Sequence, residues 1–244
     1  MFKNLKEKLK TWKLTKNMCD IIHLLKLRLT KNKRRKELQQ KGIDIMAYVQ
    51  NVLSKTGKTF FFDMGTLLGL VREGGILKHD LDIDATILGC STEESANELR
   101  DLFLSEGCLH RYRITVDGIG IVEDTFIYNG IKFDICYYYE DGDKHLCYLG
   151  YKDPKVKYDD IAVVNSVVLA CDKIEKTTTI KIGKYSLNIP EEPEKYLVQR
   201  YGESWRVPDK GYVYWKGPSA TTIPNMARQE SCLNESTVEE EFDD

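Results

Sequence analysis

The amino-acid sequence predicts an α+β domain, built from helices and short strands and preceded by a basic helical extension. Apolar residues recur at helical spacings along the first 55 residues. Short β-rich runs, separated by turn signals, dominate residues 112–139. With 244 residues, of which 42% are hydrophobic, the chain is long enough for one sizeable core. Nothing in the sequence requires a second domain.

The first forty residues are strongly basic. They hold 13 Lys or Arg and 3 Asp or Glu, a net charge of +10, so the other residues, with 23 against 35, carry −12. Apolar side chains recur between the lysines at spacings of three, four and three: Phe2, Leu5, Leu9 and Trp12. This pattern predicts a basic amphipathic helix, and we assign residues 1–37 to a helical extension. It either adsorbs to an anionic membrane surface through residues 1–36 or packs on the domain, and both interpretations stay open.

The composition also limits which classes of partner and which cellular compartment are expected. The aromatic-basic interleaving of an RNA-binding module does not follow the extension, so nucleic acid is not expected as a partner. No apolar run approaches the ~20 residues of a membrane span, and the beginning of the chain lacks the apolar core of a signal peptide. We therefore expect a cytoplasmic protein, peripheral at the inner membrane face if the extension binds lipid. Seven scattered cysteines without CxxC spacing argue against disulfides and a zinc site.

The first elements of the domain follow from local signals. A helix is expected over residues 37–55, ended by the Thr56-Gly57 break, and a strand over residues 59–64. Ser91 and the acidic residues that follow it predict the beginning of a helix that reaches Gly107. The next segment predicts a meander of short strands over residues 112–116, 119–122, 124–128 and 131–139, with Asn129-Gly130 as a hairpin turn.

The last third of the chain gives fewer signals. A strand is expected over residues 161–169, then a hairpin around Gly183-Lys184 and a short helix over residues 194–201 that stops at Gly202. Residues 229–244 hold many acids and few large apolar side chains, so we expect a disordered acidic tail. Residues 38–228 remain for the central domain.

Three aspartates alternate with apolar residues in the segment Asp80-Leu-Asp-Ile-Asp84-Ala. Such alternation places the three carboxylates on one face of a strand. Clustered carboxylates are costly to bury without a cation, and ligands that are all oxygen favour Mg²⁺ or Mn²⁺ over zinc. An EF-hand loop does not fit, because Ala85 stands where the loop requires glycine and Ser91 stands where it requires glutamate. A solvated strand face is the other interpretation of the alternation.

Two further segments join the aspartates in a candidate site. Asp134 interrupts an otherwise apolar strand and is a second carboxylate that invites an explanation. Gly65 and Thr66 follow a strand and open a short helix, where backbone amides and a hydroxyl can receive a phosphate. Arg72, at the end of that helix, is a candidate phosphate clamp, and His79 stands next to the aspartates.

The run GTLLGLVREGGILKHDLDID, residues 65–84, resembles the signature of the LicD/fukutin family, a branch of the polymerase-β-like nucleotidyltransferase superfamily. The KFDI around Asp134 is similar to the third-carboxylate strand of this family. The segment Ile189 to Pro208 looks like its C-terminal motif, Pro…Leu…Tyr-Gly-x-x-Trp-x-x-Pro. Lys78-His79 replaces the Pro-Trp of LicD proteins, although the fukutin branch commonly has a histidine there. The similarity covers residues 38–208.

The resemblance implies a nucleotidyltransferase-like mixed β-sheet flanked by helices, with residues 38–228 as the catalytic domain. It implies transfer of a phospho-alcohol, such as phosphocholine or ribitol phosphate, from a CDP-activated donor to a hydroxyl of a cell-surface or lipid-linked glycan, with release of CMP. The residues that it implies divide into two groups. Asp82, Asp84 and Asp134 would be the catalytic, metal-binding residues, and Gly65, Thr66, Arg72, His79 and Asp80 would bind substrate. Asp134 is our candidate general base.

Two other functions remain as alternatives. A nucleotidyltransferase of the same superfamily, acting on a small molecule or RNA, would need the metal-binding acids but not the Tyr201-Gly-x-x-Trp205 motif. A degenerate transferase that only binds metal would need neither donor nor acceptor. In every case but the solvated strand, we expect Mg²⁺ or Mn²⁺ at the aspartates.

Overall fold

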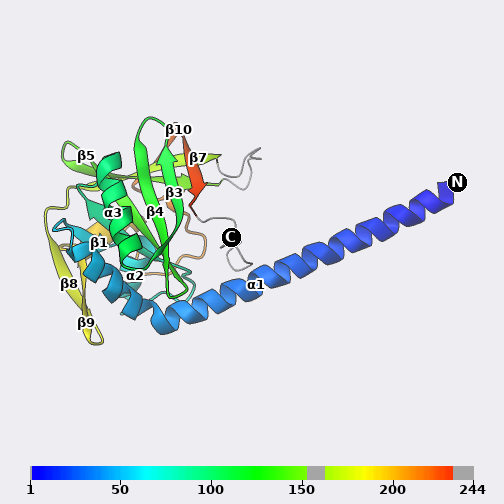
Figure 1. Cartoon of the computed structure of the whole chain (residues 1–244), viewed down its shortest axis with the longest axis horizontal. Helices are drawn as coiled ribbons and strands as arrows, with labels where there is room; N and C mark the ends of the chain where they lie inside the picture. The colour runs from blue at the N-terminus through cyan, green and yellow to red at the C-terminus, as the bar shows by residue number, and fades with distance from the viewer. Residues whose placement is uncertain (1, 153–162, 233–244) are drawn as a thin grey trace.

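A large mixed sheet forms the centre of the molecule in a computed structural model, which describes residues 2–152 and 163–232, with side chains from residue 28 on (Figure 1). Its strands run in the order β1-β2-β5-β4-β3-β10-β7-β6, and β5 also pairs with β6. The strands from β5 to β6 in that order therefore close into a ring. They are β1 Phe60–Phe62, β2 Ile83–Leu88, β3 Leu109–Val116, β4 Gly120–Tyr128, β5 Ile131–Asp141, β6 Lys144–Tyr151, β7 Val163–Asp172 and β10 Ala220–Ser231.

Helices and one hairpin surround this sheet. The helices are α1 Phe2–Ser54, α2 Met64–Arg72, α3 Glu93–Ser105 and α4 Pro193–Tyr201, with a short 3-10 helix η1 at Tyr214–Lys216. The hairpin consists of β8 Thr177–Ile182 and β9 Tyr185–Pro190. Local chemistry explains the helix ends, since Thr92 caps α3 in a capping box with Ser95, and Gly202 ends α4 with a positive φ of 84°. The mixed α+β architecture expected from the sequence is therefore confirmed.

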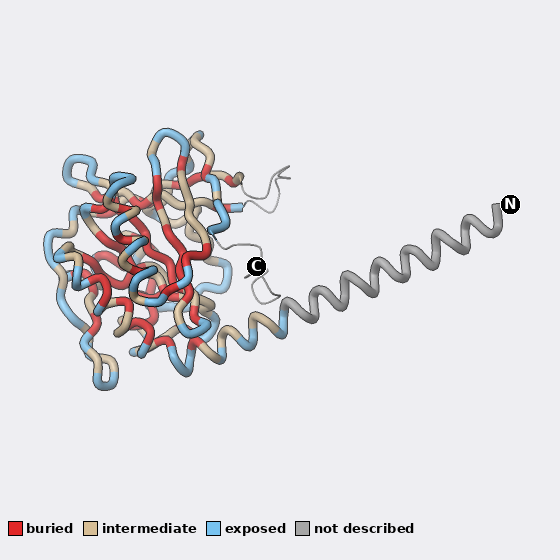
Figure 2. Tube along the Cα trace, in the orientation of Figure 1, coloured by how far each residue is buried: buried red, intermediate tan, exposed pale blue. Residues whose placement is uncertain are grey.

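The helix α1 is continuous from Phe2 to Ser54, although the sequence had suggested separate helical segments. No glycine or proline interrupts its first forty residues, so no local signal ends it there. The boundary that we placed between residues 37 and 38 lies inside the helix, and Leu38 is the first buried residue among those of α1 whose side chains are described. Beyond that point its apolar face is buried at helical spacing: Leu38, Ile45, Met46, Val49, Val52 and Leu53. Figure 2 colours the buried residues of the body red.

The expected meander is present, because β3, β4, β5 and β6 pair in succession and antiparallel. Asn129 and Gly130 both have positive φ, 50° and 79°, as the hairpin turn between β4 and β5 requires. The segments 119–122 and 124–128, expected as two strands, form the single strand β4 from Gly120 on, and Ile119 lies in the turn before it. Pairing with β3 runs from Gly120 to Ile127 and so joins the two segments.

Two strands had no prediction from the sequence, namely β6 and β10. The strand β10 pairs with β7 from Ala220 to Arg228 and with β3 from Ala227 to Ser231. The first three residues assigned to the acidic tail therefore lie in a strand, because pairing with β3 outweighs their polar composition. The rest of the predicted tail, from residue 233, lies outside the described residues.

The core lies between the helices and the strands nearest to β2. Its largest fully buried side chains are aromatic for the most part and include Phe61, Phe62, Phe103, Phe126, Phe133, Tyr137 and Tyr138. The β2 and β5 strands lie in this core and pair in parallel, which places Asp84 beside Asp134 in the ladder. No helix in the described part of the chain is long and apolar enough to cross a membrane.

Candidate active site

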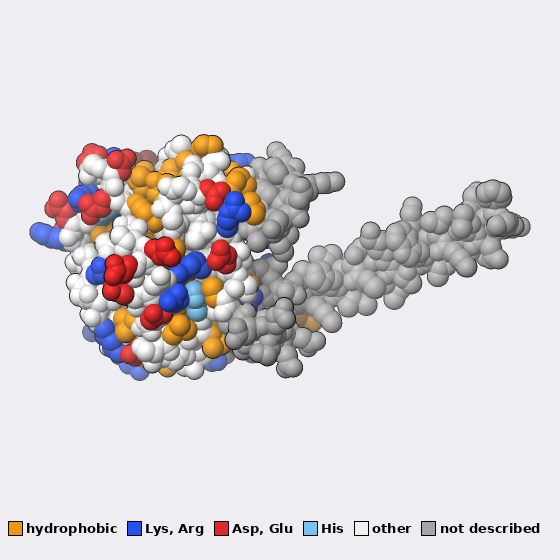
Figure 3. Space-filling view, turned by 45° about the horizontal axis from the view of Figure 1, so that its top comes forward, with side chains coloured by type: hydrophobic (Ala, Val, Ile, Leu, Met, Phe, Trp, Pro, Cys, Tyr) orange, Lys and Arg blue, Asp and Glu red, His pale blue; other side chains and the backbone are white. Residues whose placement is uncertain are grey.

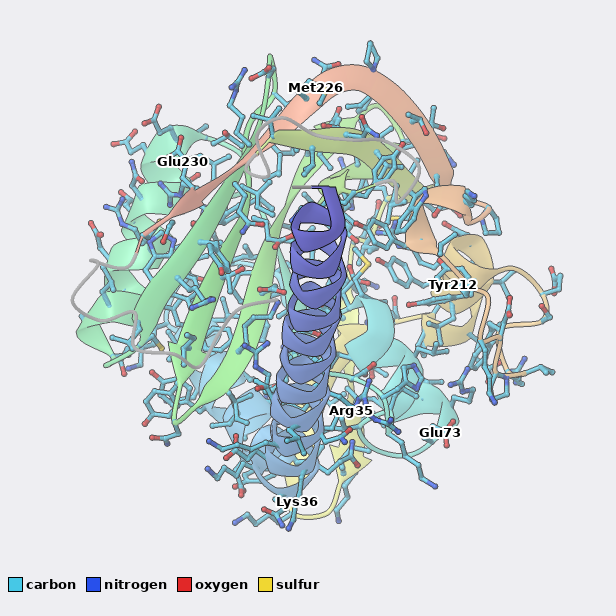
Figure 4. The ribbon with its side chains drawn as sticks, turned by 90° about the vertical axis from the view of Figure 1, so that its right-hand side faces the viewer. Arg35, Lys36, Glu73, Tyr212, Met226 and Glu230 are labelled. Carbon is cyan, nitrogen blue, oxygen red and sulfur yellow. The ribbon has the colours of Figure 1, made fainter. Side chains whose placement is uncertain are left out.

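A cavity brings together the residues that the sequence had marked. Residues of strands β2 to β7 line it, together with α2, the loop before β2, α4 and residues 204–214. Seven of the eight predicted site residues line this cavity: Gly65, Arg72, His79, Asp80, Asp82, Asp84 and Asp134. Figure 4 views the molecule from the side where Tyr212, in the segment after α4, and Glu73, just beyond α2, both lie. Thr66, the eighth, is buried behind the cavity wall.

The junction between β1 and α2 fixes the position of Asp84. The Asp84 backbone N–H donates to the Thr66 hydroxyl at 2.8 Å, and the Asp63 N–H donates to the Asp84 carbonyl at 3.1 Å. Asp63 caps α2 by accepting the Met64 N–H, and Met64 takes a left-handed φ of 48°. Thr66 was expected to contact substrate, but its hydroxyl instead accepts a hydrogen bond from the strand that carries Asp84. In the fold, Thr66 therefore positions the strand that carries Asp84.

Asp80 and Asp82 are not part of the strand, contrary to the alternation argument. The strand β2 begins at Ile83, and a turn in which the Asp80 N–H donates to the Leu77 carbonyl at 3.1 Å precedes it. Partial exposure in this loop lets the carboxylates of Asp80 and Asp82 retain some contact with water. Asp80 lies against Gly65, because a Cβ placed on that glycine would be 3.5 Å from both oxygens of its carboxylate. A larger side chain at residue 65 would crowd the acid.

The aspartates form a cluster with an excess of negative charge. Burial raises the pKa of Asp84 well above its ordinary value, and repulsion from Asp82 and Asp134 adds to the rise. Burial and repulsion from Asp82 raise the pKa of Asp80 to about 7, although Arg72 opposes the rise. Glu123, which also lines the cavity, has its pKa raised to about 8, first by burial and then by Asp134. Such a cluster attracts a cation.

Lys132 is a cation within this cluster that sequence reasoning did not single out. Its Nζ lies 3.0 Å from Asp82 Oδ2 and 3.3 Å from Asp134 Oδ2. The Thr125 hydroxyl donates to the other Asp134 oxygen at 2.6 Å. Lys132 stands two residues before Asp134 on β5, so the alternation of side chains along a strand could have placed it on the same face. Glu123 gave no such signal, because it belongs to the neighbouring strand.

The donor atoms suit a hard divalent ion. Asp82, Asp84 and Asp134 offer only carboxylate oxygens, the ligands that Mg²⁺ and Mn²⁺ prefer, and the excess negative charge favours such an ion. Among the described side chains, those of residues 28–152 and 163–232, however, no group of three or more His, Cys, Asp or Glu already has metal-binding spacing. The Lys132 ammonium lies between two of the three carboxylates. The residues present therefore fit an ion in chemistry and charge.

The wall opposite the aspartates carries the predicted C-terminal motif. Arg200 is buried, and its Nε donates to the Tyr196 hydroxyl at 3.0 Å, which in turn donates to Asp63 Oδ1 at 2.7 Å. Arg72 Nη1 donates to the Trp205 carbonyl at 3.2 Å and so connects α2 to this wall. Arg200 and Trp205 line the cavity, and two of their buried donors, Arg200 Nη1 and Trp205 Nε1, have no hydrogen-bond partner among the described residues.

Comparison with known proteins decides the family. Residues 57–192, more than half of the chain, match the family model described as LicD/FKTN/FKRP, nucleotidyltransferase domain. The chain belongs to this family. A mouse (Mus musculus) protein named Ribitol-5-phosphate transferase FKTN is 26% identical over 192 residues, which are 77% of this chain and 38% of the mouse protein. The chain thus spans well under half of the length of that relative.

Membership in the LicD/FKTN/FKRP family confirms the resemblance drawn from the sequence and the nucleotidyltransferase-like fold. The matched region contains both the aspartate segment and the Asp134 strand. Lys78-His79, where the chain leaves the LicD pattern, lies in the turn before Asp80, and the His79 side chain is 72% exposed with its Nε2 3.9 Å from Asp80 Oδ1. Arg35 of α1, labelled in Figure 4, donates from Nε to the His79 carbonyl at 3.4 Å. Lys78-His79, the pair that departs from the LicD pattern, is therefore at the rim of the cavity.

Proposed function

We propose that this domain transfers a phospho-alcohol from a CDP-activated donor to a hydroxyl of a glycan or lipid-linked glycan and releases CMP. Ribitol phosphate is the first candidate for the transferred group, because the mouse relative is named a ribitol-5-phosphate transferase. The observation that supports the proposal most directly is the pairing of Asp84 with Asp134 in adjacent parallel strands at the cavity. This arrangement gathers acids where a diphosphate and a hydroxyl can meet.

The cavity offers separate surfaces for the parts of the donor. Gly65 at the beginning of α2 presents backbone N–H groups to the diphosphate, and Arg72 and Arg200 add positive charge. The aromatic side chains of Tyr201 and Trp205 provide a flat apolar wall on which a nucleobase can stack. The donor would thereby be oriented with its alcohol-bearing phosphorus toward the aspartates.

Asp82, Asp84 and Asp134 would hold the divalent ion, Mg²⁺ or Mn²⁺, which is proposed from their oxygen-only chemistry. When bound, the ion lowers the pKa of the acceptor hydroxyl and neutralises charge on the diphosphate. Asp134, oriented by Thr125, is the proposed acceptor of the hydroxyl proton. The acceptor oxygen then forms its bond to the alcohol-bearing phosphorus as the bond from that phosphorus to the oxygen of CMP breaks, with the two oxygens in line.

The proposal is tested by CMP release. The full chain is incubated with Mg²⁺ or Mn²⁺, an acceptor glycan, and CDP-ribitol, CDP-glycerol or CDP-choline in turn. CMP that forms with at least one donor, and disappears in Asp84→Asn, supports the proposal. Absence of CMP with all three donors contradicts it, and pyrophosphate release from a nucleoside triphosphate would instead favour a nucleotidyltransferase.

A further inference from the structure

Lys132 lies between two of the carboxylates that we propose as ion ligands. It stands on β5 with Asp134, and its ammonium lies within ion-pair distance of both Asp82 and Asp134, at 3.0 and 3.3 Å. The three side chains are 23%, 31% and 11% exposed, so the ion pairs are largely shielded from water. Ion pairs at this depth are screened less than those on the open surface.

The Lys132 ammonium is a partner for some carboxylates of the aspartate cluster and not for others. Asp134 has a partner for each oxygen, Thr125 for Oδ1 and Lys132 for Oδ2. Asp84, the ladder neighbour of Asp134, receives no hydrogen bond or ion pair at its carboxylate from any residue in the described part of the chain. One positive charge therefore pulls Asp82 and Asp134 together while Asp84 remains open.

We propose that Lys132 is a resident counter-cation that holds Asp82 and Asp134 in place when no divalent ion is bound and competes with the ion for them. The inference rests on the proposed function, because it takes these acids as ion ligands. Without a cation, two carboxylates at this distance would repel each other and spread apart. A lysine suits the task, since its flexible four-carbon stem lets the ammonium withdraw toward solvent when an ion arrives.

An ordinary surface ion pair provides the comparison. Lys144 Nζ lies 2.7 Å from Asp172 Oδ1, and the two side chains are 43% and 46% exposed. Such a pair contributes little to stability and holds no acid for an ion. Lys144→Met thus removes the same charge from the same protein without touching the aspartate cluster, and it is the matched control.

The experiment measures Mn²⁺ binding to the full chain by the electron paramagnetic resonance of free Mn²⁺. In Lys132→Met, which keeps the length of the side chain, we expect Mn²⁺ to bind about tenfold more tightly than in the wild type, because the competing charge is gone. Lys132→Arg, which keeps the positive charge, should show no such gain in affinity, and Lys144→Met should bind Mn²⁺ as the wild type does. An unchanged or weaker affinity in Lys132→Met overturns the inference.

Thermal unfolding gives a second measurement. Without metal, Lys132→Met should unfold at a lower temperature than the wild type, and Mn²⁺ should raise its melting temperature by more than it raises that of the wild type. An equal melting temperature in both metal-free proteins contradicts the holding role. Asp84→Asn separates the two proposals. If the wild type and Asp84→Asn bind Mn²⁺ equally, the aspartates are not the ion site, and both the proposed function and this inference fail. If Asp84→Asn loses Mn²⁺ binding while Lys132→Met binds Mn²⁺ no more tightly than the wild type, the ion site stands and the role of Lys132 fails.

Discussion

At the scale of single residues, Asp84 is placed at the expense of stability. Its carboxylate is surrounded by Asp80, Asp82 and Asp134, and burial with this repulsion raises its pKa well above the ordinary value. When the pKa of an acid is higher in the folded than in the unfolded protein, the free energy of unfolding falls as pH rises from the unfolded pKa to the folded pKa. Without a bound cation, the ionised carboxylate of Asp84 therefore lowers the stability of the fold at neutral pH.

Asp84→Asn should consequently separate activity from stability. We expect CMP release to fall by at least about 100-fold, because an amide is a poor ligand for a hard ion. The melting temperature without metal at pH 7 should stay equal or rise, since a repelled charge is removed. Both are measured on the same preparation by CMP release and circular dichroism. A large fall in the melting temperature would mean that the carboxylate supports the fold.

Trp205 offers a test of the opposite wall. Trp205→Phe keeps an aromatic ring in the cavity but removes Nε1, a buried donor without a partner among the described residues. We expect the donor Kd to rise by roughly 10- to 150-fold, the effect of one lost hydrogen bond to a charged group. Stability should change little, because no protein acceptor loses its partner. Nucleotide binding by calorimetry measures the effect, and an unchanged Kd would remove Nε1 from the binding surface.

At the scale of elements, α2 and β2 act as one unit through Thr66. Thr66→Val removes the acceptor of the Asp84 N–H and leaves that buried donor unpaired. We expect a loss of about 1–3 kcal/mol in the free energy of unfolding together with weaker Mn²⁺ binding. Thr66→Ser keeps the hydroxyl and should retain both properties. The measurements are urea unfolding and Mn²⁺ titration. Normal Mn²⁺ affinity in Thr66→Val would show that Asp84 is positioned without this contact.

A second unit joins β3, β4 and β5 through the buried Asp124. Burial alone would raise its pKa, but hydrogen bonds from Arg113, His110 and Tyr137 hold it below the ordinary value. An acid with a lowered pKa in the folded protein stabilises the fold above the unfolded pKa of about 3.9. That contribution is lost as pH falls through the folded value, so the wild type should lose stability in acid.

Asp124→Asn should lower the free energy of unfolding at pH 7 by about 3–5 kcal/mol, since Arg113, whose side chain is only 11% exposed, loses its carboxylate partner. The variant should also lose less stability than the wild type between pH 5 and pH 3. Urea unfolding at several pH values measures both effects. Parallel stability curves for the two proteins would show that Asp124 does not set the acid limit.

Local sequence signals predicted many of the helices and strands. The elements that were not predicted depend on pairing between segments far apart in the sequence. Asn129-Gly130 and Gly202 mark their turns because few residues take positive φ. The position of β10 between β3 and β7 depends on residues more than 40 apart, which no local pattern encodes. The site shows the same division. Residues 65–84, which include the aspartate segment, gave seven of the eight predicted site residues, but Arg200 and Trp205 reach the cavity only because α4 packs against α2.

At the scale of the whole molecule, charge is distributed unevenly along the chain. The first forty residues carry +10 and the remainder −12, yet acidic and basic side chains are interspersed over the face in Figure 3. Basic charge is thus concentrated in the first part of α1, and Leu38 is the first buried residue among the described side chains of this helix. In Figure 1 that part of the helix points away from the sheet. The stability of the domain should therefore not depend on it.

We propose that this extension brings the domain to an anionic surface, where each clustered Lys or Arg adds about 1 kcal/mol. Deletion of residues 1–30 removes much of the basic charge and keeps Arg35, which contacts His79 at the cavity rim. The full chain should sediment with phosphatidylserine vesicles, and less so at high salt, while the deletion variant should stay in solution. Its melting temperature should match that of the full chain, because the buried face of α1 is intact. Equal sedimentation of both proteins, together with a lower melting temperature of the deletion variant, would show instead that the extension packs on the domain.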